Sequence, residues 1–167
     1  MTDQTTAAAT GPTARLSPVD SAADALFVYG TLRFRRILTA LLGRVPAGTP
    51  ATAPGWRTAA LARRPYPGLV PAPGQTASGL LLSGLSPQEW RVLDDFEDDE
   101  YELVPLPVDS GTRKPPGTAW AYIWAAPGDV RPENWDADTF AERQLDQYAA
   151  RLEEAAAPRQ GRGELRA

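Results

Sequence analysis

Apolar runs and segments with helical periodicity alternate along the middle of the chain, and they predict a domain that mixes strands and helices. Residues 26–30 form an apolar run that ends in glycine, which is typical of a buried strand followed by a turn. From there to Gly43 the apolar residues fall on one helical face, so we expect Thr31 to cap a helix and Gly43 to end it. The first unit is therefore strand, tight turn and helix.

The clearest local signals predict a second helix over residues 87–96. Ser86 stands at the capping position, Pro87 suits the first helical position, and Glu89 completes a capping box with Ser86. Immediately before this helix, the apolar residues 78–85 predict a central strand.

The remaining segments complete an α+β pattern. Residues 101–108 and 118–126 alternate as strands do, and Asp138 opens a last helix. Residues 45–73 are dense in Pro and Gly, and we expect only short, irregular strands there. Five or so strands with three interspersed helices predict a small mixed, partly closed β-barrel with flanking helices.

The composition fits one globular domain between two polar tails. The chain has 167 residues, of which 43% are hydrophobic and 23% charged. Residues 1–23 and 157–167 are rich in small, polar and charged residues, so we expect disordered tails around a domain at 24–156. No stretch resembles a secretion signal or reaches membrane-spanning length, which predicts a cytoplasmic protein without a membrane partner.

The residue types that are missing exclude several kinds of chemistry. The chain has no cysteine and no histidine, so disulfides, Cys or His metal sites and Ser-His-Asp triads are excluded. A net charge of −4 with scattered arginines gives no broad positive field, and no nucleic-acid partner is expected. Proton transfer near neutral pH must therefore use carboxylates, tyrosines, lysine, the termini or the substrate itself.

Residues 93–102, LDDFEDDEYE, place seven acidic side chains in ten positions at the end of the second predicted helix. Exposed carboxylates there face the negative pole of the helix and cost about 0.3–1 kcal/mol each. Most of them can form a solvated acidic turn, and the spacing of an EF-hand calcium loop is absent. A further interpretation turns one carboxylate inward beside Phe96 and Tyr101 as an acid/base, because apolar surroundings and neighbouring negative charges raise its pKa. Glu97, directly after Phe96, is the best placed.

The second candidate site is the turn VYGTL at residues 28–32. Gly30 allows a backbone or a ligand to approach closely. The free N–H groups of Thr31, Leu32 and Arg33, together with the Arg33 side chain, favour a small anion such as a carboxylate. Taken alone, the same five residues also fit a simple strand-to-helix turn.

These segments together resemble the γ-glutamylcyclotransferase-like superfamily, in the branch that contains the γ-glutamylamine cyclotransferases and the plant avirulence-induced proteins. The resemblance runs from about residue 26 to residue 148. It rests on VYGTL, YPGLV, SGLLLSGL, LDDFEDDEY and AWAYIW followed by Trp135, in that order.

The resemblance implies an enzyme that releases 5-oxoproline from a small-molecule γ-glutamyl amine or amide, with Glu97 as the acid/base. In this reaction the substrate's own α-amine attacks its γ-carbonyl, so no enzyme nucleophile, metal or cofactor is expected. The turn at residues 29–32 is expected to bind the γ-glutamyl group through its backbone. The full set of expected substrate-binding residues is Tyr29, Gly30, Thr31, Leu32, Arg33, Tyr66, Tyr101 and Tyr122.

Two departures from the family pattern concern the choice of substrate more than the mechanism. Asp98 stands where many members have glycine, and Leu103 stands where they have arginine. The branch favours a γ-glutamylamine over glutathione. Two alternatives stay open: a non-catalytic protein that binds a small ligand or a partner on the same fold, and a γ-glutamyl amide hydrolase or acyltransferase. The sequence determines neither the oligomeric state nor the pathway.

Overall fold

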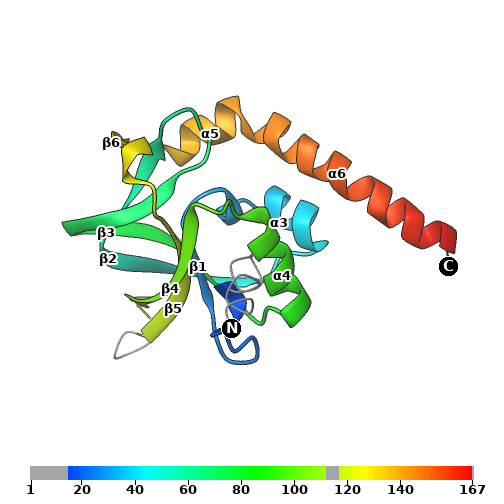
Figure 1. The fold of residues 1–167 in the computed structure, drawn as a ribbon, viewed down its shortest axis with the longest axis horizontal. Helices are drawn as coiled ribbons and strands as arrows, with labels where there is room; N and C mark the ends of the chain where they lie inside the picture. Colours follow the sequence, from blue (N-terminus) through cyan, green and yellow to red (C-terminus); the bar gives the residue numbers. More distant parts are fainter. Residues whose placement is uncertain (1–14, 112–116, 167) are drawn as a thin grey trace, which may run out of the picture.

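The computed structural model describes residues 15–111 and 117–166, with side chains described up to residue 156. Its elements follow one another as β1 (Leu26–Val28), η1 (Thr31–Arg33), α3 (Arg35–Leu42), β2 (Ala47–Leu61), β3 (Gly68–Ser83), α4 (Pro87–Phe96), β4 (Tyr101–Val108), β5 (Gly117–Trp124), η2 (Pro127–Asp129), β6 (Val130–Asn134), α5 (Ala137–Arg143) and α6 (Leu145–Arg166). Figure 1 shows α3 and α4 together on one side of the sheet, while the end of α6 extends away from the body of the molecule.

The six strands form one curled sheet in the order β4-β5-β1-β3-β2-β6. β1 is so short that β5 pairs in parallel with both β1 and β3. At the other end of the curl, the backbones of Thr52 in β2 and Asp109 after β4 exchange two hydrogen bonds of 2.8 Å. The α+β, partly closed barrel predicted from the sequence is therefore confirmed.

The central strand β1 is buried on both faces. Leu26 and Val28 belong to the core cluster that the helices cover, whereas Phe27 and Tyr29 belong to a second cluster with residues of β2, β3, β4 and β5. A strand buried on both faces needs a continuous apolar run, and this is why the pattern at its position does not alternate. The turn that follows β1 consequently starts from the middle of the molecule.

The Pro- and Gly-rich segment differs most from the prediction. Instead of short, irregular strands it contributes to two long ones, β2 and β3, which pair from Ala47↔Ser83 to Ala59↔Gly68. The register shifts between Pro54 and Trp56, where Gly55 takes a φ of 87° that only glycine adopts easily. The bulge bends the strand and helps it to accommodate its prolines. The composition alone does not reveal this bulge.

The helix at α4 is confirmed with its predicted bounds and capping box. The other two predicted helices are changed. Thr31 does not cap the first one: it begins η1, and α3 starts only after Phe34, although Gly43 ends it in the left-handed conformation as expected. The last helix is capped by Asp136 rather than Asp138, and it is interrupted at Gln144 before α6 begins.

The N-terminal segment packs on the domain from residue 15 onward, eight residues before the predicted end of the tail. Leu16 and Val19 contact the core cluster under the helices. Residues 1–14 lie outside the described residues, and α6 passes the predicted boundary at residue 156 and continues to Arg166. In the described part of the chain, no helix is both long enough and apolar enough to span a membrane.

Candidate active site

A cavity of about 110 Å³ opens where the turn after β1, the end of α4 and the first residue of β4 come together. β5, α6 and the connection between β2 and β3 also contribute to its walls. The cavity brings together all but one of the residues expected at the site. These are Tyr29, Gly30, Thr31, Leu32, Tyr66, Glu97, Tyr101 and Tyr122.

Arg33 is the exception, because it lies in a separate, open groove beside Arg57 and Gln75. Its backbone N–H is also occupied, since it donates to the carbonyl of Gly30 at 3.0 Å. The turn of η1 carries the chain away from the cavity within three residues, and no pattern in the sequence indicates so short a helix. Of the three N–H groups expected to be free, only those of Thr31 and Leu32 have no acceptor in the described part of the chain.

Gly30 is required by close packing. A Cβ atom at this position would lie 2.7 Å from the ring of Pro67, closer than any side chain tolerates. The absence of a side chain therefore lets the β2–β3 connection close over the turn. The two unpaired N–H groups that follow, on Thr31 and Leu32, lie at residues that line the cavity.

Glu97 is the C-cap residue of α4 and also lines the cavity. Its side chain is half-buried, and its carboxylate accepts no hydrogen bond from any residue that the structure describes. The pKa of Glu97 is raised to about 8, mainly by burial; the positive charge of Arg15 opposes the rise, and the negative charges of Asp98 and Asp94 add to it. The inward-facing acid expected in the acidic stretch is therefore present at this position.

The tyrosines form the walls of the cavity, and most of their hydroxyl groups are already bonded to the protein. Tyr29 donates to the carbonyl of Tyr122 at 2.5 Å, and Tyr101 donates to the carbonyl of Pro67 at 2.6 Å. Tyr122 donates to Asp94 at 2.6 Å. Burial raises the pKa of all three phenols well above the ordinary value. These side chains shape the cavity and are poorly suited to donate or accept a proton during a reaction.

Asp94 and Arg15, like the cavity residue Tyr148, were not predicted from the sequence. Asp94 is only 1% exposed, and Arg15 Nε lies 3.1 Å from its Oδ1 atom. Burial raises the pKa of Asp94 despite the Tyr122 hydroxyl and Arg15, both of which lower it. The helical position of Asp94, four residues after the buried Trp90 and so on the same face, could have indicated a buried side chain, whereas nothing in the sequence links it to Arg15.

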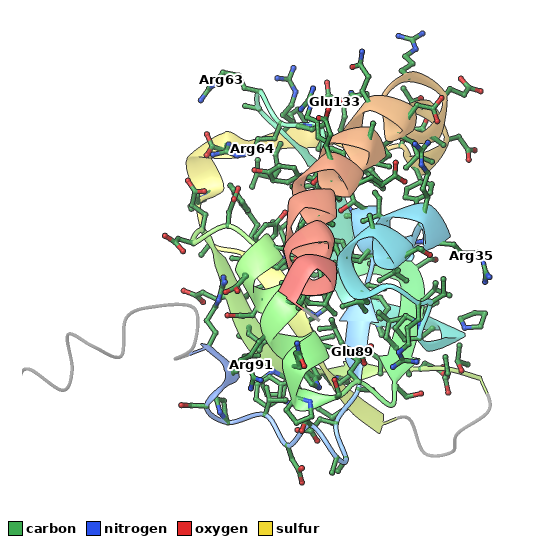
Figure 2. The ribbon with its side chains drawn as sticks, turned by 90° about the vertical axis from the view of Figure 1, so that its right-hand side faces the viewer. Arg35, Arg63, Arg64, Glu89, Arg91 and Glu133 are labelled. Carbon is green, nitrogen blue, oxygen red and sulfur yellow. The ribbon has the colours of Figure 1, made fainter. Side chains whose placement is uncertain are left out.

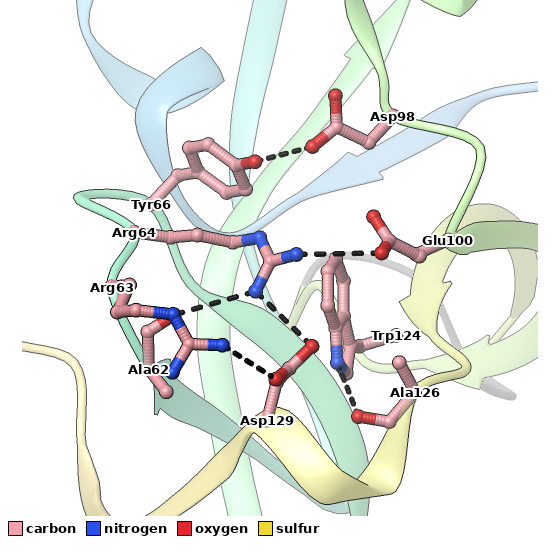
Figure 3. Close-up of polar contacts among 9 residues, drawn as sticks. All are labelled: Ala62, Arg63, Arg64, Tyr66, Asp98, Glu100, Trp124, Ala126 and Asp129. Atoms are coloured by element: carbon pink, nitrogen blue, oxygen red, sulfur yellow. Dashed lines mark hydrogen bonds and ion pairs between the residues drawn. The ribbon is translucent and has the colours of Figure 1, made fainter.

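A polar network ties the β2–β3 connection to the loop after α4 (Figure 3), and two of its members, Tyr66 and Asp98, line the cavity. Tyr66 donates a short hydrogen bond to Asp98, and Arg64 pairs with Glu100 at 3.3 Å and with Asp129 at 3.1 Å. The guanidinium carbon of Arg64 also lies 4.8 Å from the centre of the Trp124 ring. Figure 2 shows that Arg64 turns back toward the body of the molecule whereas Arg63 points away from it, in agreement with side-chain exposures of 21% and 81%.

The sequence matches the family model described as gamma-glutamyl cyclotransferase, AIG2-like, over residues 26–147. The chain belongs to this family. Within it, AIG2-like protein D of Arabidopsis thaliana is 32% identical over 137 residues, which cover 78% of this chain and 88% of the relative. AIG2-like protein C of the same plant is 29% identical over 130 residues, covering 76% of this chain and 74% of the relative.

Solved structures agree with the fold of this chain. The solution structure of one Arabidopsis thaliana protein matches with a TM-score of 0.60 and 25% identity, covering 81% of this chain and 92% of that one. A second one from the same plant has a TM-score of 0.60 and 24% identity, covering 82% and 86%. The family match includes the turn after β1, all of α4 and Glu97, whereas Arg15 and Tyr148 fall outside its bounds.

Proposed function

We propose that this member of the family is an enzyme that converts a γ-glutamyl amine or amide to 5-oxoproline and a free amine. The α-nitrogen of the substrate attacks its own γ-carbonyl carbon, the bond from that carbon to the amide nitrogen breaks, and a proton moves from the attacking nitrogen to the departing one. The observation that carries the proposal is the half-buried Glu97 carboxylate, without a hydrogen-bond donor among the described residues, in the same cavity as the turn after β1.

Glu97 serves as the acid/base. With a pKa of about 8, its carboxylate is a stronger base than an exposed glutamate and returns the proton to the leaving nitrogen more readily than a strongly basic group would. Proton transfer by a positioned side chain contributes about 10² to 10⁴ to the rate. One carboxylate suffices, because the same proton leaves one nitrogen and arrives at the other.

The turn after β1 binds the substrate in this proposal. The unpaired N–H groups of Thr31 and Leu32 suit the α-carboxylate of a γ-glutamyl group, which would hold the substrate's flexible chain in the bent form that ring closure needs. Such positioning is valuable here because a tethered nucleophile can lower the barrier by roughly 7–11 kcal/mol. The cavity is small for a ligand pocket, which fits a glutamyl group inside and the leaving amine outside.

Product analysis tests the proposal. The purified protein is mixed with a panel of γ-glutamyl amines, γ-glutamyl dipeptides and glutathione, and 5-oxoproline, glutamate and the released amine are measured. We expect 5-oxoproline and amine in equal amounts. Glutamate as the product would show an amide hydrolase instead, and binding without any product would show a non-catalytic protein on this fold.

The variant Glu97→Gln tests whether Glu97 is the acid/base. This variant keeps the shape of the side chain but cannot accept the proton, so we expect turnover to fall by about 10² to 10⁴. Glu102→Gln is the matched control, since Glu102 belongs to the same acidic stretch but is exposed on β4. If Glu97→Gln retained most of the activity, another group would have to move the proton.

A further inference from the structure

The guanidinium group of Arg15 holds the end of α4 through four backbone carbonyls. One terminal nitrogen donates to Asp98 at 2.9 Å and to Tyr101 at 3.0 Å. The other donates to Asp94 at 2.8 Å and to Glu97 at 3.2 Å. A planar, forked cation can satisfy several acceptors at once, so a single side chain ties these four carbonyls together, although those of Asp94 and Asp98 also accept the backbone N–H groups of Glu97 and Tyr101. One of the four carbonyls belongs to the proposed acid/base itself.

Arg15 also supports the wall of the cavity behind Glu97. Its Nε atom lies 3.1 Å from the buried Asp94 carboxylate, which accepts the hydroxyl of Tyr122 at 2.6 Å. The guanidinium carbon lies 5.3 Å from the centre of the Tyr122 ring, and Tyr122 lines the cavity. The side chain of Arg15 is only 14% exposed. A residue from the N-terminal segment is thus built into the packing of the site without lining the cavity.

Three charged residues shift the pKa of Glu97, and Arg15 is the only cation among them. Asp94 and Asp98 raise the pKa of Glu97, and Arg15 lowers it. The other titratable groups at the cavity are phenols from the turn after β1, the β2–β3 connection, β4, β5 and α6. They are Tyr29, Tyr66, Tyr101, Tyr122 and Tyr148.

We propose that Arg15 is a positioning residue for Glu97, which fixes the backbone of the acid/base and places a positive charge near it. The expected effect of Arg15 on turnover rests on the proposed function. The contacts between Arg15 and the end of α4 do not depend on it. This role of Arg15 makes the N-terminal segment part of the working site, beyond the bounds of the family match. A chain that began after residue 15 would keep the cavity residues but lose the cation that holds them.

Two substitutions in the full chain separate the geometric effect from the effect of charge. Arg15→Lys keeps the positive charge but cannot bond to four carbonyls, whereas Arg15→Gln removes the charge as well. We expect both to lower kcat for 5-oxoproline formation by about 10- to 100-fold with little change in KM, because small misplacements of catalytic groups are costly. Only Arg15→Gln should shift the acidic limb of the pH–rate profile clearly to higher pH.

Arg44→Gln is the matched control at the opposite end of the same helix. Arg44 bonds to the Glu89 carboxylate at 2.6 and 2.7 Å and to the carbonyl of Gly84 at 3.1 Å, away from the cavity. We expect its kcat and pH profile to stay within about twofold of the original protein. An Arg15→Gln protein with an unchanged rate and profile would overturn the proposal.

A titration of Glu97 tests the same inference without using activity. In protein labelled with ¹³C at the glutamate carboxyl groups, the Glu97 signal is assigned by its absence from Glu97→Gln and followed over pH by NMR. We expect its midpoint to rise in Arg15→Gln and to change less in Arg15→Lys. If the original protein forms no 5-oxoproline, the proposed function fails, but this titration still decides the role of Arg15. If Arg15→Gln does not fold, Arg15→Lys decides it, since an unchanged kcat in that variant would exclude the geometric role.

Discussion

The two ends of α4 are held in opposite ways. At the first end, Ser86 and Glu89 exchange backbone and side-chain hydrogen bonds of 3.1 and 3.0 Å across three positions of sequence. At the last end, Arg15 reaches the carbonyl of Asp94 from 79 positions away. The first end is therefore satisfied by its own neighbours, whereas the last end depends on the fold of the whole domain.

This difference separates stability from chemistry along one helix. The capping box satisfies groups that any helix leaves unpaired, so it stabilises α4 wherever α4 lies. The last end contains a buried aspartate whose Oδ2 atom lacks a hydrogen-bond donor among the described residues, followed by a glutamate whose pKa is raised. Both features cost stability, and such costs are common where a site needs perturbed groups. α4 thus combines a locally stable beginning with an end that only the tertiary structure can maintain.

The largest effect is expected at the buried pair. Asp94→Ala leaves the mostly buried guanidinium of Arg15 without its counter-charge and Tyr122 without its acceptor. Removal of one partner from a buried ion pair typically costs about 3–5 kcal/mol, and we expect a loss of that size in the free energy of unfolding. Urea denaturation followed by circular dichroism measures it.

Asp94→Asn is the control for this substitution, because the amide oxygen can still accept from Tyr122 while the negative charge is gone. We expect a loss of stability smaller than that of Asp94→Ala. If Asp94→Ala cost less than about 1 kcal/mol, the last end of α4 would not depend on this pair and the contrast between the two ends would disappear.

A pH-dependent gain of stability is expected from Glu97→Gln. The pKa of Glu97 rises from 4.5 to about 8 on folding, so the folded protein binds this proton more tightly than the unfolded chain does. Stability from this group is therefore complete below pH 4.5 and is lost as the pH rises through 8. Glutamine does not titrate, and we expect the variant to be more stable than the original protein at pH 9 by on the order of 5 kcal/mol.

The comparison at pH 4 provides the baseline for that measurement, because the glutamate is largely protonated in both states there. A difference between the two proteins that stayed constant from pH 4 to pH 9 would show that Glu97 is not perturbed by folding. Together with the loss of turnover, the expected gain would show that the last end of α4 is built for chemistry at the expense of stability.

The same division explains what could be predicted from the sequence. The beginning of α4 was predicted to the residue because its signals lie within four positions, from Ser86 to Glu89. Glu97 was found because an acid at the wrong pole of a helix needs a reason, and the resemblance to a known family supplied one. The turn after β1 was located in the same way, although its short helix and the separate position of Arg33 were not.

What could not be predicted depends on distant contacts. Arg15 stands in a polar segment that has the composition of a tail, and only the folded chain brings its guanidinium to the end of α4. The long strands β2 and β3 were missed for a similar reason, since their prolines and the bulge at Gly55 weaken every local strand signal. Pairing along nearly their whole length supplies the missing stability.

The smallest effect is expected at the locally stable end. Ser86→Ala removes the side-chain acceptor of the Glu89 N–H, and loss of such a cap costs about 1 kcal/mol. Because Arg15 holds the other end independently, we expect the position of Glu97, kcat and the pH–rate profile to be unchanged. Ser86→Thr should restore most of the stability, since threonine can accept the same hydrogen bond. A large fall in kcat at unchanged folding would mean that the two ends of α4 are coupled, and that the helix transmits strain from its cap to the site.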